Sequence, residues 1–311
     1  MKKFEEKKPG TAKWFTVIIV VLLLFLASYM FAGMLSLLFG EQELPTGGNI
    51  ALIPIEGVLM SSGSSLESGV VSSGKIVEFI KKADENDDIK AIIFDINSPG
   101  GSGVASEEIA NAIKKVNKTK VSFIRELGAS GAYWVASATD RIFVSRMSLT
   151  GSIGVTASYL EFAGLMKDYN VTYRRLVAGK YKDMGSPFKE LAPEEQEIFE
   201  KQLKTVHDFF IEEVAKNRKL SNAAVRQLAT GEPILGANAK EFGLVDELGG
   251  KEDAIRYVEN KLNITAEIAE YKQKRTFLEL LQGYISDHLY NLGFGIGRGL
   301  SYKEEKPIVW T

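Results

Sequence analysis

The sequence contains no cysteine, and this absence excludes several classes of protein. Without a thiol there can be no disulfide framework, no thiolate metal site and no cysteine nucleophile. Histidine is also scarce, with two in 311 residues. An excess of either charge is missing too, since 38 Lys and Arg face 40 Asp and Glu. A broad basic face of the kind that binds nucleic acid is therefore not expected.

One apolar stretch near the N-terminus is long enough to cross a membrane. Residues 14–39 contain no charged side chain, and this length of about 26 exceeds the roughly 20 residues that span the hydrocarbon core. Residues 1–13, before the stretch, are rich in lysine, whereas Glu41 and Glu43 follow it. The positive-inside rule predicts a single-pass protein of the cell membrane, with a cytoplasmic N-terminus and the remainder extracytoplasmic. A cleaved signal peptide is the weaker alternative, because its apolar region is normally about 7–15 residues long.

The rest of the chain divides into a linker, a domain and a tail. Residues 40–48 have the polar, Pro- and Gly-containing composition of a linker. Residues 49–272 alternate apolar strand patterns with amphipathic helix patterns, which predicts an α/β layered fold with a mainly parallel sheet. Strands are expected at 49–59, 90–97, 120–126, 141–145, 172–178 and 264–271, and helices at 75–83, 106–116, 131–138, 193–217, 223–229 and 251–261. The apolar tail, 273–311, could dock on the domain, on another subunit or on a bilayer.

Two glycine-rich segments follow apolar strands, where an α/β fold places its site. In Asn97-Ser-Pro-Gly-Gly-Ser-Gly103 the glycines let backbone N–H groups turn toward a ligand, and two such donors make an oxyanion hole. A phosphate loop is disfavoured because no Gly-Lys-Ser/Thr ending follows. In Gly128-Ala-Ser-Gly-Ala-Tyr133, Ser130 stands between a strand and a helix, where the helix dipole favours a developing anion. A plain N-cap serine is the alternative, and the Gly-x-Ser-x-Gly elbow is absent.

A serine nucleophile needs a base, and the two histidines are poor candidates. His207 falls within the helix pattern 193–217 and His288 within the apolar tail, away from any glycine-rich loop. A lysine whose pKa is lowered by burial can serve instead. Lys180 and Lys182 follow a predicted strand, and their spacing leaves both open. The ordinary interpretation of a loop lysine is solvent exposure.

Five motifs in this order resemble the short form of signal peptide peptidase A, in serine peptidase family S49. They are Asn97-Ser-Pro-Gly-Gly, Gly128-Ala-Ser-Gly-Ala-Tyr, Thr150-Gly-Ser-Ile-Gly-Val155, Gly179-Lys-Tyr-Lys-Asp-Met-Gly-Ser-Pro-Phe188 and Gly243-Leu-Val-Asp-Glu-Leu-Gly249. The resemblance implies that Ser130 is the nucleophile, Lys182 the general base and Ser152 the residue that orients the lysine amine. It also implies an oxyanion hole formed by the backbone N–H of Gly131 and that of Gly100 or Gly101.

The resemblance further implies a fold like that of the caseinolytic protease and crotonase group. It implies a ring-shaped homo-oligomer whose neighbours complete the active sites, and substrates that are remnant signal peptides in the membrane. No metal or other cofactor is needed if neutral Lys182 takes the Ser130 proton and the alkoxide attacks a peptide carbonyl. Three alternatives stay open: a stomatin-partner-type Ser-Lys membrane peptidase, a crotonase-type acyl-CoA enzyme and a noncatalytic membrane scaffold.

Overall fold

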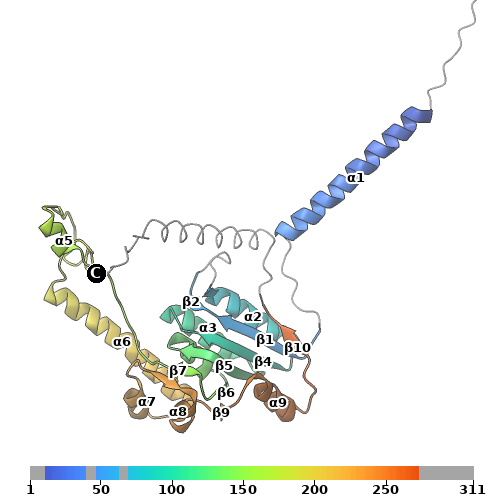
Figure 1. The fold of residues 1–311 in the computed structure, drawn as a ribbon. Coiled ribbons are helices and arrows are strands. Elements are labelled where there is room, and N and C mark those ends of the chain that lie inside the picture. The colour runs from blue at the N-terminus through green and yellow to red at the C-terminus, as the bar shows by residue number, and fades with distance from the viewer. Residues whose placement is uncertain (1–10, 40–46, 63–68, 273–311) are drawn as a thin grey trace, which may run out of the picture. The chain divides into compact units, whose positions relative to one another are not determined.

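The structure, a computed structural model, describes residues 11–39, 47–62 and 69–272 (Figure 1). The chain divides into two units, whose described parts are residues 11–39 and residues 47–272 without 63–68. The predicted tail with His288, and most of the predicted linker, lie outside the described residues.

The described element of the first unit is helix α1 (Thr11–Phe39). Its described side chains are those of residues 17–31 and Gly33, and the large apolar ones among them are exposed. Among the residues that the structure describes, no helix has both the length and the apolar character needed to cross a membrane.

The second unit is built on a mostly parallel sheet, which confirms the predicted α/β fold class. Within the described residues the sheet has eight strands in the order β10-β1-β4-β5-β6-β9, with β7 beside β5 and β8 beside β7. Among the strands that the structure describes in this sheet, β7 and β8 alone pair in antiparallel fashion. A second, two-stranded sheet pairs β2 with β3. The strands are β1 (Ile50–Glu56), β2 (Val58–Met60), β3 (Val70–Ser72), β4 (Ala91–Ser98), β5 (Thr119–Ala129), β6 (Arg141–Val144), β7 (Leu149–Gly151), β8 (Pro233–Leu235), β9 (Glu247–Leu248) and β10 (Ile268–Glu270).

Helices cover both faces of this sheet, as Figure 1 shows for α2 and α3 on one side and α9 on the other. Ala254 and Val258 of α9 pack against Leu52, Ile93 and Phe143 from three strands. Because side chains alternate along a strand, the residues between these face the layer of α2, α3 and α4. The helices of this unit are α2 (Ser73–Glu85), α3 (Gly103–Lys115), α4 (Gly131–Ser137), α5 (Ala163–Asp168), α6 (Pro193–Arg218), α7 (Asn222–Leu228), α8 (Gly236–Glu241) and α9 (Lys251–Leu262).

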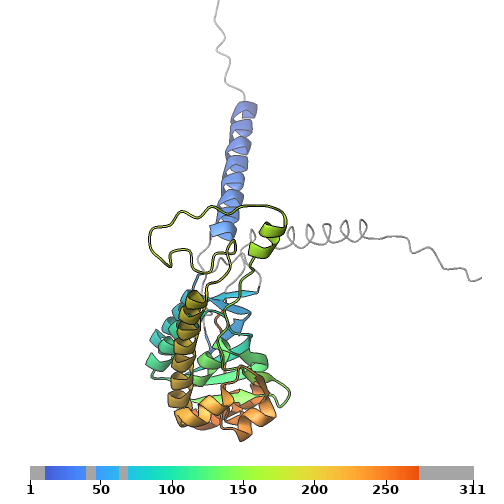
Figure 2. The same cartoon turned by 90° about the vertical axis from the view of Figure 1, so that its left-hand side faces the viewer.

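The segment from 155 to 192, which we call the arm, departs from the prediction. The predicted strand at 172–178 is wrong, because the structure has no strand there. A strand needs a neighbour to satisfy its backbone, and the arm stands at the far end of α6 from the sheet (Figures 1 and 2). The apolar residues that suggested a strand are exposed instead, and Leu176 reaches 96%.

Candidate active site

Ser130 lies at the junction of β5 and α4 in a strained backbone conformation. Its φ of 53° and ψ of −126° are unusual for a residue with a side chain. The conformation is held from the next strand, because the Ser130 N–H donates to the Gly151 carbonyl at 2.8 Å. The half-buried hydroxyl makes no capping hydrogen bond to α4, which argues against the plain N-cap interpretation. Strain of this kind clusters at functional sites.

Two backbone nitrogens, those of Gly101 and Gly131, lie close together beside Ser130. A Cβ added to Gly100 would lie 2.6 Å from the Gly131 nitrogen, and one added to Gly131 would lie 3.5 Å from the Gly101 nitrogen. Both glycines of the first loop have positive φ, 91° at Gly100 and 154° at Gly101. This stretch therefore passes close to the start of α4 only because it has no side chains.

The hydrogen bonds distinguish the two loop glycines. The Gly100 N–H donates to the Ser98 hydroxyl at 3.1 Å, so it is already satisfied. For the Gly101 and Gly131 N–H groups the described part of the chain supplies no acceptor. An oxyanion hole needs two free donors aimed at one point, which favours Gly101 with Gly131.

Ser152 lies beside Ser130 because β5 and β7 run in parallel register. Ala129 pairs with Gly151, and the two serines follow these residues. Ser152 also has a positive φ, 50°, and its hydroxyl donates to the Gly231 carbonyl at 2.8 Å. A hydroxyl has lone pairs left to accept from an amine, so this arrangement is compatible with the predicted orienting role.

Within the described residues, no hydrogen bond or ion pair brings Lys182 to Ser130. It is exposed, it lies in the arm, and its backbone N–H donates to Gly179 at 3.2 Å. The neighbouring Asp183 is held by the Arg175 guanidinium, with Nη2 at 2.8 Å from Oδ1, and this lowers the pKa of Asp183. The structure thus brings together the serines and glycines of the predicted site but leaves its lysine apart.

The two rival bases are engaged elsewhere. The Lys180 ammonium forms a hydrogen-bonded ion pair with Glu194, which raises the pKa of Lys180 and keeps it protonated. His207 lies on α6 with Nε2 3.2 Å from the Ile153 carbonyl oxygen. A carbonyl can only accept, so Nε2 is engaged in a hydrogen bond to the main chain of Ile153. Both observations favour Lys182.

Two serines have positioning roles that the sequence did not assign to them. Ser98 fixes the loop by accepting from Gly100 and by donating to the Gly57 carbonyl at 2.6 Å. Ser106 is fully buried in α3 directly behind Gly131. Their roles depend on contacts between segments far apart in the chain, and a single serine in a helix or strand pattern does not reveal them.

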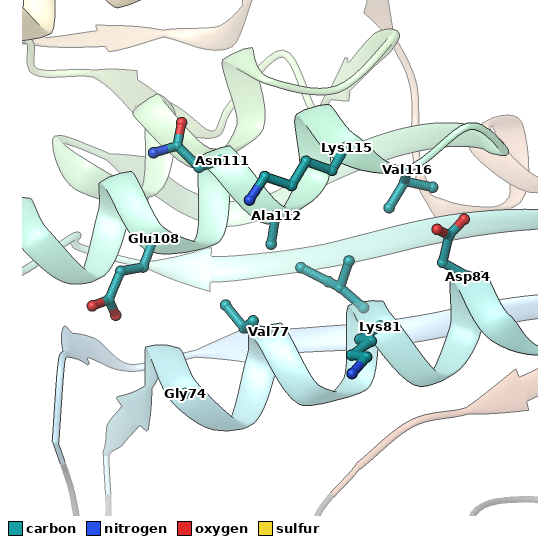
Figure 3. Close-up of a pocket in the computed structure, with 10 residues that line it drawn as sticks. Gly74, Val77, Lys81, Asp84, Glu108, Asn111, Ala112, Lys115 and Val116 are labelled. Atoms are coloured by element: carbon teal, nitrogen blue, oxygen red, sulfur yellow. The ribbon is translucent and has the colours of Figure 1, made fainter.

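A hollow of about 650 Å³ between α2 and α3 contains none of the predicted site residues (Figure 3). Its floor includes Val77, Ala112 and Val116, and charges of both signs surround it. Among the described residues there is also no cluster of side chains suited to hold a metal ion.

Comparison with known proteins identifies the family. The model of peptidase family S49 matches residues 112–265. A protein of Methanocaldococcus jannaschii named as a protease is 37% identical over 72% of this chain and 71% of its own length. A protein of Enterococcus faecium named as a signal peptide peptidase, SppA, is 32% identical over 76% of this chain and 71% of its own. The structure of a ClpP1 mutant from Listeria monocytogenes matches 66% of this chain and 94% of that one, with 15% identity and a TM-score of 0.44.

The matched segment contains Ser130, Gly131 and Ser152, so the family assignment and the geometry concern the same part of the molecule. The chain belongs to peptidase family S49 and is a serine peptidase.

Proposed function

We propose that this chain is a membrane-anchored endopeptidase that degrades remnant signal peptides, with Ser130 as nucleophile and Lys182 as general base. The observation that carries the proposal is the strained Ser130 beside the free amides of Gly101 and Gly131. Similarity to a protein named as a signal peptide peptidase supports the substrate class. The parallel sheet between helix layers supports a fold of the caseinolytic protease and crotonase group.

The mechanism is acyl transfer. Neutral Lys182 accepts the Ser130 proton while Ser130 Oγ attacks the carbonyl carbon of the scissile peptide. The oxyanion that forms is stabilised by the N–H groups of Gly101 and Gly131, which are fixed before the reaction and need no reorganisation. Lys182 then gives its proton to the leaving amine of the substrate. In the second half of the reaction the neutral Lys182 amine deprotonates a water molecule, which attacks the acyl-enzyme and releases the acyl group. Ser152 orients the lysine.

A ring of copies would complete the site. The arm that contains Lys182 forms its ion pairs within itself and with the first turn of α6, and it exposes large apolar side chains to solvent. An apolar segment in this state is suited to bury itself against another subunit. We therefore include in the proposal that Lys182 of one copy serves Ser130 of a neighbour.

Residues 14–39 supply the proposed anchor, with the catalytic unit outside the cytoplasm. The sequence carries this part of the proposal, through the uncharged stretch and the lysines before it. Because the chain has no cysteine, single Lys3→Cys and Lys204→Cys variants give clean labels. In intact cells a membrane-impermeant maleimide should label Lys204→Cys and spare Lys3→Cys, and the reverse pattern would contradict the orientation.

The activity is tested with the full-length chain and a synthetic signal peptide. Ser130→Ala and Lys182→Ala should each lower kcat by about a thousandfold or more, while Lys180→Ala should retain most of it. A fluorophosphonate probe should label the wild type and not Ser130→Ala. Full activity in Lys182→Ala would redirect the search to another base, and a folded but inactive wild type would contradict the catalytic proposal.

A further inference from the structure

A groove with an apolar floor lies between α3, α4 and α6. Its volume is about 540 Å³. Val104, Val206 and Phe209 line it and are 58%, 40% and 54% exposed, and Trp134 completes its apolar surface. Val206 and Phe209 are three residues apart on α6, so both lie on the helix face that looks into the groove. Large apolar side chains this exposed and this close together indicate a binding surface.

The charged residues that line this groove have one sign. Glu107, Glu212 and Glu213 line it, and its lining within the described residues includes no lysine or arginine. Glu213 is paired with Lys114, which leaves Glu107 and Glu212 as exposed carboxylates without a cation among the described side chains. The hollow between α2 and α3 differs, because there Lys81 and Lys115 balance the acidic residues.

The groove is continuous with the catalytic loops. Ser102 and Gly103, which line it, come directly after Gly101. Trp134 is one helical turn beyond Ser130 and donates its backbone N–H to the Ser130 carbonyl at 3.1 Å. A peptide whose flanking part occupied the groove would therefore have its neighbouring residues close to the nucleophile.

We propose that this groove binds a segment of the substrate in which a basic residue adjoins an apolar one. The carboxylates of Glu107 and Glu212 attract the cation, and the surface of Val104, Val206 and Phe209 takes the apolar side chains. Charge complementarity selects this occupant, because the described lining offers carboxylates and an apolar surface but no cation. The inference rests on the proposed function and adds to it a preference for basic residues beside the cleaved segment.

The test separates binding from cleavage. Two fluorescent peptides share one apolar run and differ in two residues before it, Lys-Lys in one and Gln-Gln in the other. Their Kd is measured by anisotropy on the full-length Ser130→Ala chain, where no cleavage interferes. The Lys-Lys peptide should bind about three- to tenfold more tightly, as expected for two partly exposed ion pairs. Added salt should reduce this ratio.

Variants connect the preference to the groove. Glu107→Gln with Glu212→Gln should bring the ratio of the two Kd values close to one and leave the Gln-Gln peptide unchanged. Glu197→Gln, an exposed residue of α6 outside the groove, is the matched control and should keep the ratio. With Ser130 intact, the same ratio should be seen in KM, with kcat unaltered.

Each outcome has a separate meaning. Equal affinity of the two peptides for the unaltered groove, or a preference that survives the double variant, overturns the inference. A double variant that changes the sedimentation mass and not the preference also overturns it, because the groove is then a contact between copies. If the preference is present but the chain with intact Ser130 cleaves neither peptide, the groove assignment stands and the proposed function fails.

Discussion

At the scale of single residues, the candidate site depends on the absence of side chains where two segments meet. Gly131 illustrates this, because a Cβ there would lie 2.1 Å from the Ser106 hydroxyl oxygen. Ser106 is fully buried, and its hydroxyl donates to the Ser102 carbonyl at 2.9 Å. It therefore cannot move aside without losing a hydrogen bond in the loop that bears Gly101.

This contact gives a prediction about stability. Gly131→Ala should lower the free energy of unfolding by about 1–3 kcal/mol, because the added methyl overpacks a closed region. Adding Ser106→Ala removes the obstructing oxygen and leaves the new methyl 3.2 Å from the Ser106 Cβ, so the double variant should recover most of the loss. Denaturant unfolding of the two single variants and the double variant measures this coupling. Simple additivity of the two effects would show that the clash is relieved in another way.

At the scale of elements, one ion pair joins α6 to the sheet. Arg218, in the last turn of α6, donates from both terminal nitrogens to Asp246 at 2.9 Å. Asp246 lies just before β9 begins, and its carboxylate also accepts a hydrogen bond from the Ile142 N–H of β6 at 2.8 Å. Partial burial of the carboxyl opposes its ionisation, but the hydrogen bonds and charge of Arg218, together with the Ile142 N–H and the charge of Arg141, lower the pKa of Asp246 overall. The pair thus connects three elements.

The stability that is lost when the Arg218–Asp246 pair is removed should depend on pH. A carboxyl with a lowered folded pKa stabilises the protein above its ordinary value of 3.8, and this contribution is lost as the pH falls through the folded value. Asp246→Asn should therefore cost about 1–3 kcal/mol at pH 7, as expected when a charged hydrogen-bonding partner is lost. The difference from wild type should shrink below pH 3.8. Urea titrations at several pH values measure it, and a difference that persists in acid would contradict the electrostatic explanation.

Helices and strands that show a hydrophobic periodicity of their own could be predicted from the sequence. Those that form only through pairing with a distant segment could not. α2 buries Ile76, Phe79, Ile80 and Ala83, the spacing of one helix face, and it was expected from that spacing. The short strands β7 and β8 were missed, since each has three residues and exists through its partner. In the site, Ser130 and the glycine loop followed from motifs, whereas the distinction between Gly100 and Gly101 needed the Ser98 hydrogen bond.

At the scale of the whole molecule, the two proposed catalytic residues lie in separate parts of the described catalytic unit. Ser130 is half-buried beside the sheet, and Lys182 is exposed in an arm that stands away from it (Figure 2). Exposed apolar side chains along the arm, among them Leu160 and Tyr169 at 73% and 74%, are costly in a free monomer. An assembly that covers them would remove this cost and would also supply the missing base.

Complementation between two inactive variants tests this arrangement. Chains with Ser130→Ala retain Lys182, and chains with Lys182→Ala retain Ser130, so a mixed ring has some interfaces where both intact residues meet. For equal co-expression and random assembly, about a quarter of the interfaces should be active if the lysine comes from a neighbour. The measurement is cleavage of the synthetic signal peptide by co-purified mixed assemblies. Ser130→Ala co-expressed with the double variant is the control and should stay inactive. Mixed assemblies that form but do not cleave would mean that each chain supplies its own lysine, and the arm would then have to fold back onto its own sheet.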